Sequence, residues 1–276
     1  MRKFPRLAAG TALGGAALLA AGAALSLGQL RSIPGQAGPG ALLGFGLPVA
    51  NLLVNLSAAA MIGGLALAVF ALPRPSRGYG AAAQLAAVGA ASFTLAAATS
   101  GLLAFLSATA LPLSADEVFG RSLALFVSSV PLGQAWLAAT VLGAVTTVLC
   151  VAVRNQTALL LVLVLAAAAL VAVAQQGHPG GTGDHAQTVT ALILHVLFAA
   201  LWLGGLLAVV VLRPLLDPES VPAVFARYSS LALISFVVVA LSGLLNASVR
   251  LNSPIELLST PYGALVAVKV VALTGI

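Results

Sequence analysis

Long apolar runs with few charged residues constrain the fold of this chain more than any other feature. Of its 276 residues, 61% are hydrophobic and 7% are charged, whereas about 25% are charged in a typical soluble domain. The hydrophobic residues suffice for about eight membrane-spanning helices of about 20 residues each. The 12 basic and 6 acidic side chains cannot cover a soluble protein of this length. The composition therefore predicts an all-α, polytopic membrane helix bundle and excludes a soluble enzyme, a nucleic-acid-binding protein and a disordered chain.

Charged residues and Pro/Gly clusters divide the apolar runs into eight expected spans. They are expected near Leu7–Leu27, Leu47–Leu72, Ala81–Leu106, Leu132–Val153, Ala158–Gln175, Thr188–Leu212, Ser229–Val249 and from Tyr262 onward. The eighth has only about 15 residues before Ile276, fewer than the roughly 20 that a span needs, so we expect the chain to be truncated within it. The first follows a basic start like that of a signal peptide, but its uncharged run exceeds the usual h-region of about 7–15 residues. We expect this span to be retained, with cleavage as the alternative.

The basic residues predict the orientation in the membrane. With a cytoplasmic N-terminus, eight of them face the cytoplasm and three face outward, an arrangement that the positive-inside rule favours. The cytoplasmic set is Arg2, Lys3, Arg6, Arg74, Arg77, Arg154, Arg213 and Arg227, and the outer set is Arg31, Arg121 and Arg250. We therefore expect a multi-pass protein of the cytoplasmic membrane with its N-terminus inside and its histidines in or near the outer leaflet.

Two outer segments have a recognisable local pattern. Ser32–Gly46 is rich in Pro and Gly, which predicts an irregular loop. Ser114 and Glu117 have the spacing of a capping box, which predicts a short interfacial helix near 114–130 with Ser114 as its N-cap. This helix is expected to be a structural lid, with a gating role as the alternative. We expect residues 1–187 to form an N-terminal membrane region of about five spans and residues 188–276 a second region of about three.

The three histidines fall within 18 positions of the chain. His178 and His185 bracket a glycine-rich loop, to which Asp184 adds a carboxylate. Imidazole suits copper, zinc, nickel and iron, and a carboxylate can supply a further oxygen ligand. The loop is thus a candidate metal site, and the alternative is a flexible loop with solvated histidines.

His195 lies inside the expected sixth span, about 10–12 Å below its outer end at 1.5 Å per residue. Ionisable residues at such depth usually face the bundle interior and are candidates for function. Trp202 is expected on the same helix face, two turns deeper, and Gly204 and Gly205 allow another backbone to approach closely. The alternative role for His195 is a structural hydrogen bond between helices.

The remaining polar residues inside spans indicate structure more than chemistry. Lys269 is expected to snorkel outward or to pair with Asp184 or Glu256. Asn246 is expected to hydrogen-bond to a neighbouring helix, and Met61 to pack in the core. No phosphate loop, nucleophile elbow or zinc-protease motif occurs. We therefore expect no enzymatic activity, and three histidines with no Cys-x-x-Cys-His motif make bound haem unexpected.

The C-terminal third resembles a known family. His195–Leu206, with its Trp-x-Gly-Gly sequence, is similar to the membrane histidine signature of the copper resistance protein D (CopD) family. Ser242–Leu251, Thr260–Gly263 and the following Lys269 are similar to that family's later spans. The first five spans, Pro131–Trp136 above all, resemble the N-terminal region of actinobacterial proteins in which a CopD-like part precedes a cytochrome c oxidase assembly (CtaG-like) part.

The resemblance implies a protein of the cytoplasmic membrane that imports or delivers copper ion, and it carries over only His195 as a site residue. His178, Asp184 and His185 are added from the residues alone. The expected partners are copper ion, an extracytoplasmic copper-binding protein and respiratory oxidase subunits, and no nucleic acid. The alternative function is a non-transporting scaffold or assembly factor for a haem-copper oxidase, and a transporter of an organic solute is the weaker third hypothesis.

Overall fold

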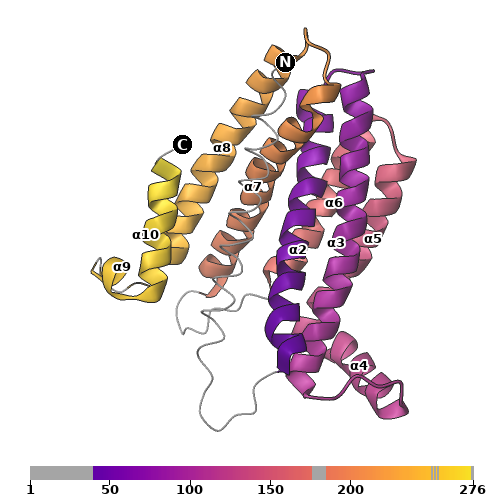
Figure 1. The fold of residues 1–276 in the computed structure, drawn as a ribbon, viewed down its shortest axis with the longest axis vertical. Coiled ribbons are helices and arrows are strands. Elements are labelled where there is room, and N and C mark those ends of the chain that lie inside the picture. The colour runs from indigo at the N-terminus through magenta and orange to yellow at the C-terminus, as the bar shows by residue number, and fades with distance from the viewer. Residues whose placement is uncertain (1–39, 176–184, 250, 252, 254, 275–276) are drawn as a thin grey trace.

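The computed structural model describes residues 40–175, 185–249, 251, 253 and 255–274, apart from the side chains of some helical residues, among them His185 and Lys269. Every regular element in these ranges is a helix (Figure 1). The elements are α2 (Gly40–Ala66) with the π-helical turn η1 (Leu67–Ala71), α3 (Arg77–Thr109), α4 (Glu117–Ser129), α5 (Pro131–Ala152), α6 (Gln156–Ala174), α7 (His185–Leu212) with the 3-10 turn η2 (Arg213–Leu215), α8 (Val221–Ser248), α9 (Glu256–Ser259) and α10 (Pro261–Thr274).

Six helices in the described ranges are long and apolar enough to cross a membrane. They are Leu42–Ala71, Arg77–Thr109, Pro131–Ala152, Gln156–Ala174, Val189–Leu215 and Val221–Ser248. The predicted all-α, polytopic membrane helix bundle is thus confirmed, and the protein is a multi-pass membrane protein. The expected first span, Leu7–Leu27, lies outside the described residues. The expected eighth span corresponds to α10, whose 14 residues are too few to cross a membrane.

Two expected boundaries were wrong. The loop expected over Ser32–Gly46 ends earlier, because α2 begins at Gly40 and continues through Pro48. A membrane helix tolerates such breaker residues, since leaving the helix would expose backbone polar groups to lipid. The seventh span begins at Val221 instead of Ser229, with Pro222 in the first turn of α8, where its missing N–H costs no helical hydrogen bond.

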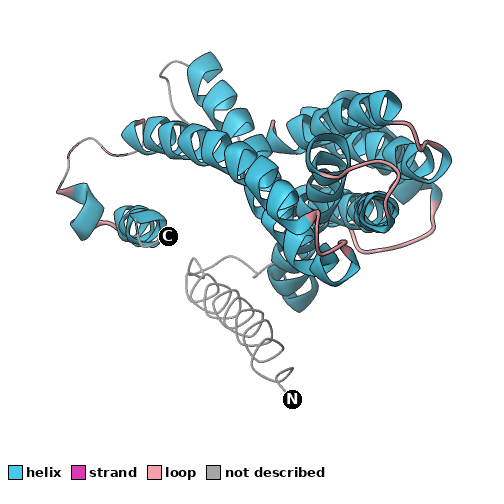
Figure 2. Cartoon of the chain, turned by 90° about the horizontal axis from the view of Figure 1, so that it is seen from above, coloured by secondary structure: helices cyan, strands magenta, loops and turns pink. Residues whose placement is uncertain are grey.

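The long helices run side by side, and α2 lies at the centre of their packing (Figure 1). The principal contacts join α2 to α3, α3 to α5, α2 to α7 and α7 to α8. Seen along the bundle, α9 and α10 stand apart from the other helices (Figure 2). The helix α7 therefore connects the packed group α2–α6 to α8.

Glycines allow the closest of these helix contacts. A Cβ atom on Gly204 of α7 would lie 2.1 Å from the carbonyl oxygen of Ala59 on α2, and one on Gly89 of α3 would lie 2.5 Å from the backbone nitrogen of Met61. Both distances are too short for any side chain. The expected close approach at Gly204 is thus present, and small residues hold the bundle together as they do in other membrane proteins.

One end of the bundle is tied together by arginine side chains. Arg227 of α8 donates to the Ala71 carbonyl oxygen at 3.2 Å, and Tyr79 of α3 donates to the Arg154 carbonyl oxygen at 2.7 Å. The Arg74 guanidinium donates to the same Arg154 carbonyl and covers the Tyr79 ring, 4.5 Å from its centroid. Arg77 begins α3 and Arg213 follows α7, so the five described arginines assigned to the cytoplasmic side all lie at this end. We refer to it as the arginine end.

The helix α4 covers part of the opposite end, but the expected N-cap was wrong. Asp116, not Ser114, caps α4, and its Oδ1 accepts from the Phe119 backbone N–H at 2.7 Å. A carboxylate is favoured there by the positive end of the helix dipole, whereas the Ser114 hydroxyl instead accepts from the Asp116 backbone N–H at 3.4 Å. The ring of Phe105 in α3 packs against Phe119 and Phe126, with centroids 5.2 and 5.5 Å away. These contacts fix α4 on the bundle.

Candidate functional site

His195 is an ionisable side chain that is held between two membrane helices. It lies half-buried on α7, and its Nδ1 is 3.1 Å from the Val239 carbonyl oxygen and 3.2 Å from the Ser242 hydroxyl oxygen, both on α8. The α7 backbone sets its depth in the membrane, and the α8 contacts set the orientation of its ring.

These contacts determine the tautomer of the neutral His195 ring. The Val239 carbonyl can only accept a hydrogen bond, and the Ser242 hydroxyl donates its own proton to the Val238 carbonyl at 2.6 Å. Two acceptors therefore face Nδ1, so Nδ1 carries the proton and the lone pair lies on Nε2. A backbone carbonyl on one nitrogen is the usual means of orienting a histidine that binds a metal through the other.

The segment of α8 around Ser242 is shaped to accept the ring. A Cβ atom on Gly243 would lie 3.3 Å from the His195 Cε1, so the glycine leaves room for the imidazole. Asn246 donates from Nδ2 to the Ser242 carbonyl oxygen at 2.9 Å, within its own helix. The hydrogen bond to a neighbouring helix that we expected for Asn246 is not the one observed, because the carbonyl one turn earlier satisfies the amide.

Two cavities meet at His195. One, of about 190 Å³, lies towards α2, α3 and α6, and its lining includes Asn55 and Phe93. The other, of about 560 Å³, lies between α7, α8 and α10, and its lining includes Asn246 and Tyr262. His195 lines both, so its ring separates a space inside the bundle from a space beside α8.

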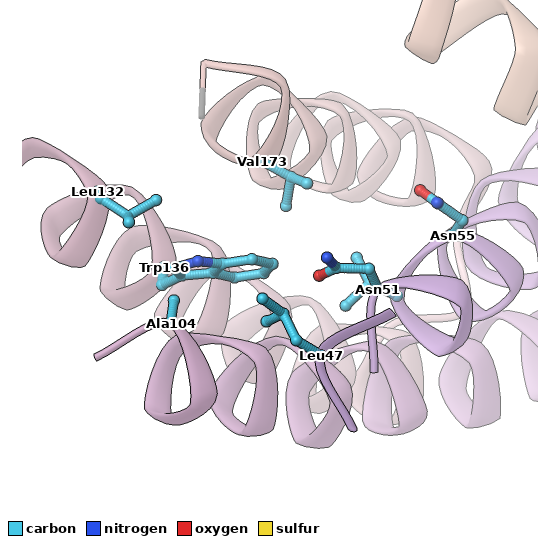
Figure 3. Close-up of a pocket in the computed structure, with 8 residues that line it drawn as sticks. Leu47, Asn51, Asn55, Ala104, Leu132, Trp136 and Val173 are labelled. Carbon is cyan, nitrogen blue, oxygen red and sulfur yellow. The ribbon is translucent and has the colours of Figure 1, made fainter. Parts of the chain in front are cut away.

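A third cavity, of about 410 Å³, lies between α2, α3, α5 and α6, at the end opposite the arginines (Figure 3). Asn51 and Trp136 point into it from α2 and α5, and Asn55 lies one turn further along α2 (Figure 3). It shares Asn55 with the smaller His195 cavity. We did not predict either asparagine as a site residue, although two amides four positions apart in an apolar span were a visible signal.

The other residues of the Trp-x-Gly-Gly sequence have packing partners. The Trp202 ring meets Phe236 of α8 edge to face, with centroids 5.4 Å apart, and its carbonyl oxygen accepts from the Tyr228 hydroxyl at 2.7 Å. A Cβ on Gly205 would lie 2.6 Å from the Tyr228 ring. Trp202, Gly204 and Gly205 thus hold α7 against α2 and α8, the arrangement that positions His195.

The structure leaves the expected outer metal site undescribed. His178 and Asp184 lie outside the described residues, and His185 begins α7 without a described side chain. Lys269 lies in α10, again without a described side chain. Among the side chains that are described, no three of His, Cys, Asp and Glu come together to hold a metal. Met61 and Cys150 are fully buried in the core.

Two family models match the chain. The N-terminal domain of copper resistance protein D-like proteins matches residues 40–188, and copper resistance protein D matches residues 222–276. The first match alone covers more than half of the chain, from α2 to the first turn of α7, and the second covers α8 to α10. No curated protein and no solved structure matches. The two family matches, in this order along a bundle of apolar helices, show that the chain belongs to the copper resistance protein D family.

Proposed function

We propose that this protein takes copper from the outer side of the cytoplasmic membrane and imports or delivers it, with His195 as a ligand inside the membrane. Membership of a copper resistance family supports copper as the cargo. The observation that carries the proposal is the position of His195, whose ring is held by Val239 and Ser242 between two cavities. The proposed activity is transport or delivery and involves no catalysis.

The chemistry of His195 suits a cargo that must be released. Its Nε2 lone pair is a good ligand for copper, which binds nitrogen ligands more strongly than the other divalent first-row metals do. A single imidazole gives far weaker binding than a closed site with three or four ligands, so the ion can leave again. Conduction of ions requires such sites, which are favourable enough to occupy and weak enough to vacate.

His178, Asp184 and His185 are proposed to collect copper at the outer surface. His185 begins α7 and precedes His195 by ten residues, which is about 15 Å along a helix axis. Copper captured near the start of α7 therefore has to move about that far into the membrane to reach His195. Capture by histidine needs the neutral ring and should weaken below about pH 6. An extracytoplasmic copper-binding protein is the proposed donor.

Copper accumulation by cells tests this function. Cells with wild-type protein should accumulate copper faster than cells without it, and His195→Ala should remove most of the increase at equal abundance in the membrane. Leu194→Ala, which changes the neighbouring exposed residue, is the matched control and should behave as wild type. His178→Ala/His185→Ala should lower accumulation at low external copper, where capture limits the rate.

Two outcomes would contradict the proposal. Accumulation at the wild-type rate by His195→Ala would remove His195 from the pathway. Wild-type cells that hold no more copper than cells without the protein would exclude transport, and co-purification with respiratory oxidase subunits would then favour an assembly scaffold.

A further inference from the structure

We propose that Asn51 and Asn55 of α2 form an access path by which a hydrated divalent cation reaches His195 from the end of the bundle that α4 covers. This inference rests on the proposed function and adds its route and the charge state of the cargo. It arises from a feature that copper capture by the outer loop does not use, namely two polar side chains inside an apolar helix.

The two asparagines face one space, and none of the described protein groups pairs with them there. They are four positions apart on α2, so their side chains lie on one helix face about 6 Å apart along the axis. Within the described structure, neither amide hydrogen-bonds to another protein group, and both are exposed. A polar group in a membrane span is costly unless something hydrogen-bonds to it. Water or a ligand in the cavity of Figure 3 would satisfy both amides.

The cavities around these amides form a sequence that ends at the imidazole. The cavity beside Trp136 and Asn51 shares Val54, Asn55 and Val173 with the cavity beside His195. Asn55 thus lines both spaces, which are neighbours along the same face of α2. A ligand that enters beside Trp136 meets Asn51 first, then Asn55, and finally His195.

The size of the cavities suits an ion that keeps part of its water. Their volumes are about 410 and 190 Å³, and a water molecule in the liquid occupies about 30 Å³. Several waters therefore fit around an ion beside Asn51, and fewer fit beside His195. The ion would lose water as it approaches the imidazole, which can replace part of the hydration shell.

The side chains along the path favour a divalent cation over Cu⁺. Amide oxygens are hard ligands and imidazole is intermediate, whereas Cu⁺ prefers thioether and thiolate sulfur. The residues that line these two cavities include no methionine, cysteine, aspartate or glutamate. Without sulfur the path does not select Cu⁺, and without carboxylates it does not trap a divalent ion. The geometry therefore suits passage of Cu²⁺.

Substitution of the two asparagines tests the path. Asn51→Leu/Asn55→Leu should lower the initial rate of Cu²⁺ accumulation at least tenfold, while Cu²⁺ added to the purified protein in detergent should still show nitrogen coupling to His195 by electron paramagnetic resonance. The part of the signal that His195→Ala loses identifies the coupling to His195, and a single monodisperse peak in size-exclusion chromatography shows that the variant is folded. Thr99→Val on α3, which removes an exposed hydroxyl outside this path, is the matched control and should accumulate Cu²⁺ as wild type does.

A second variant should strengthen Cu²⁺ binding, so its result does not depend on a loss of transport. Asn55→Asp adds a carboxylate and should tighten equilibrium Cu²⁺ binding at least tenfold, because the charged oxygen attracts the cation. The charge state of the cargo is tested by competition during accumulation. Excess Zn²⁺ should inhibit the wild type, and Ag⁺, which resembles Cu⁺, should not.

The outcomes separate this inference from the proposed function. Wild-type accumulation by Asn51→Leu/Asn55→Leu, together with loss in His195→Ala, would overturn the asparagine path and leave the function standing. Inhibition by Ag⁺ but not by Zn²⁺ would overturn the divalent cargo. Wild-type accumulation by His195→Ala would overturn the proposed function itself.

Discussion

Gly63 of α2 and Gly204 of α7 lie in direct backbone contact, so that a Cβ atom on Gly63 would fall 2.0 Å from the Gly204 carbonyl oxygen. A Cβ atom on Gly204 would in turn lie 2.1 Å from the Ala59 carbonyl oxygen. This contact fixes the distance between the helix that carries the two asparagines and the helix that carries His195. The smaller cavity beside His195 lies between these two helices.

A methyl group at this contact should destabilise the bundle. Gly204→Ala would force α2 and α7 apart, because the added atom meets backbone, which cannot rotate away. We expect the free energy of unfolding to fall by about 1–3 kcal/mol, measured by denaturation in mixed micelles. Gly80→Ala in α3 is the control, since its Cβ would meet nothing within 4 Å, and it should be as stable as wild type or more stable. Equal stability of both variants would contradict the contact.

Ser242 should increase the affinity for copper by orienting the His195 ring. Ser242→Ala removes one of the two acceptors that face Nδ1 and leaves the Val239 carbonyl. Loss of such an orienting partner typically costs about 10–100-fold in metal affinity, so we expect an effect near the lower figure. Isothermal titration with Cu²⁺ measures it. Ser230→Ala, on the same helix and exposed, is the control, and wild-type affinity in Ser242→Ala would contradict the orienting role.

Single cysteines can establish which end of the bundle faces outward. In a Cys150→Ala background, Gly120→Cys places a thiol on α4, where nothing lies within 4 Å, and Glu219→Cys places one in the exposed turn before α8 at the arginine end. A membrane-impermeant maleimide added to intact cells should label Gly120→Cys and should label Glu219→Cys only after permeabilisation. The reverse pattern would place the arginine end outside, against the positive-inside rule.

The stabilisation of α4 by its N-cap should change with pH only in acidic solution. The Phe119 backbone N–H and the Ser114 hydroxyl hold the pKa of Asp116 below its ordinary value. The stabilisation of the first turn by the carboxylate is therefore complete above the ordinary pKa of about 3.9. It is lost as the pH falls further, through the lowered pKa. Hydrogen exchange at the Phe119 amide should speed up only in that range.

The matched control for this prediction is Asp116→Asn, which keeps a capping oxygen without a titrating group. Its Phe119 protection should be the same on both sides of that range once the intrinsic pH dependence of exchange is subtracted. Loss of protection already near pH 6 in the wild type would contradict the assignment of the cap to Asp116.

The helices could be predicted from sequence because lipid leaves little choice of structure. Between residues 40 and 249, each long apolar run that the structure describes forms a helix, so α2, α3 and α5 to α8 fall where the runs are. The predicted boundaries are wrong where a proline or a capping residue suggests a helix end that differs from the end of the apolar run. Pro48 is tolerated inside α2, and Pro222 starts α8 before the apolar run begins. At α4 two residues could cap the helix, and the charged one does.

The candidate site could be predicted only in part. His195 stands out because an ionisable residue in an apolar span is rare, and its sequence position gives its depth. The Ser242 and Val239 contacts depend on how α7 faces α8, which no local pattern specifies. Asn51 and Asn55 were missed because amides carry no charge, and it takes four packed helices to show that they border one cavity.

The arginine end also determines how this bundle can move. The π-helical turn η1 ends α2, and the carbonyls of Val69 and Ala71 within it accept from Gln156 of α6 and Arg227 of α8. The helices α6 and α8 are thereby both hydrogen-bonded to one turn of backbone. If the bundle widens around His195, we expect the helices to separate at their far ends, because these hydrogen bonds hold the ends at η1 together.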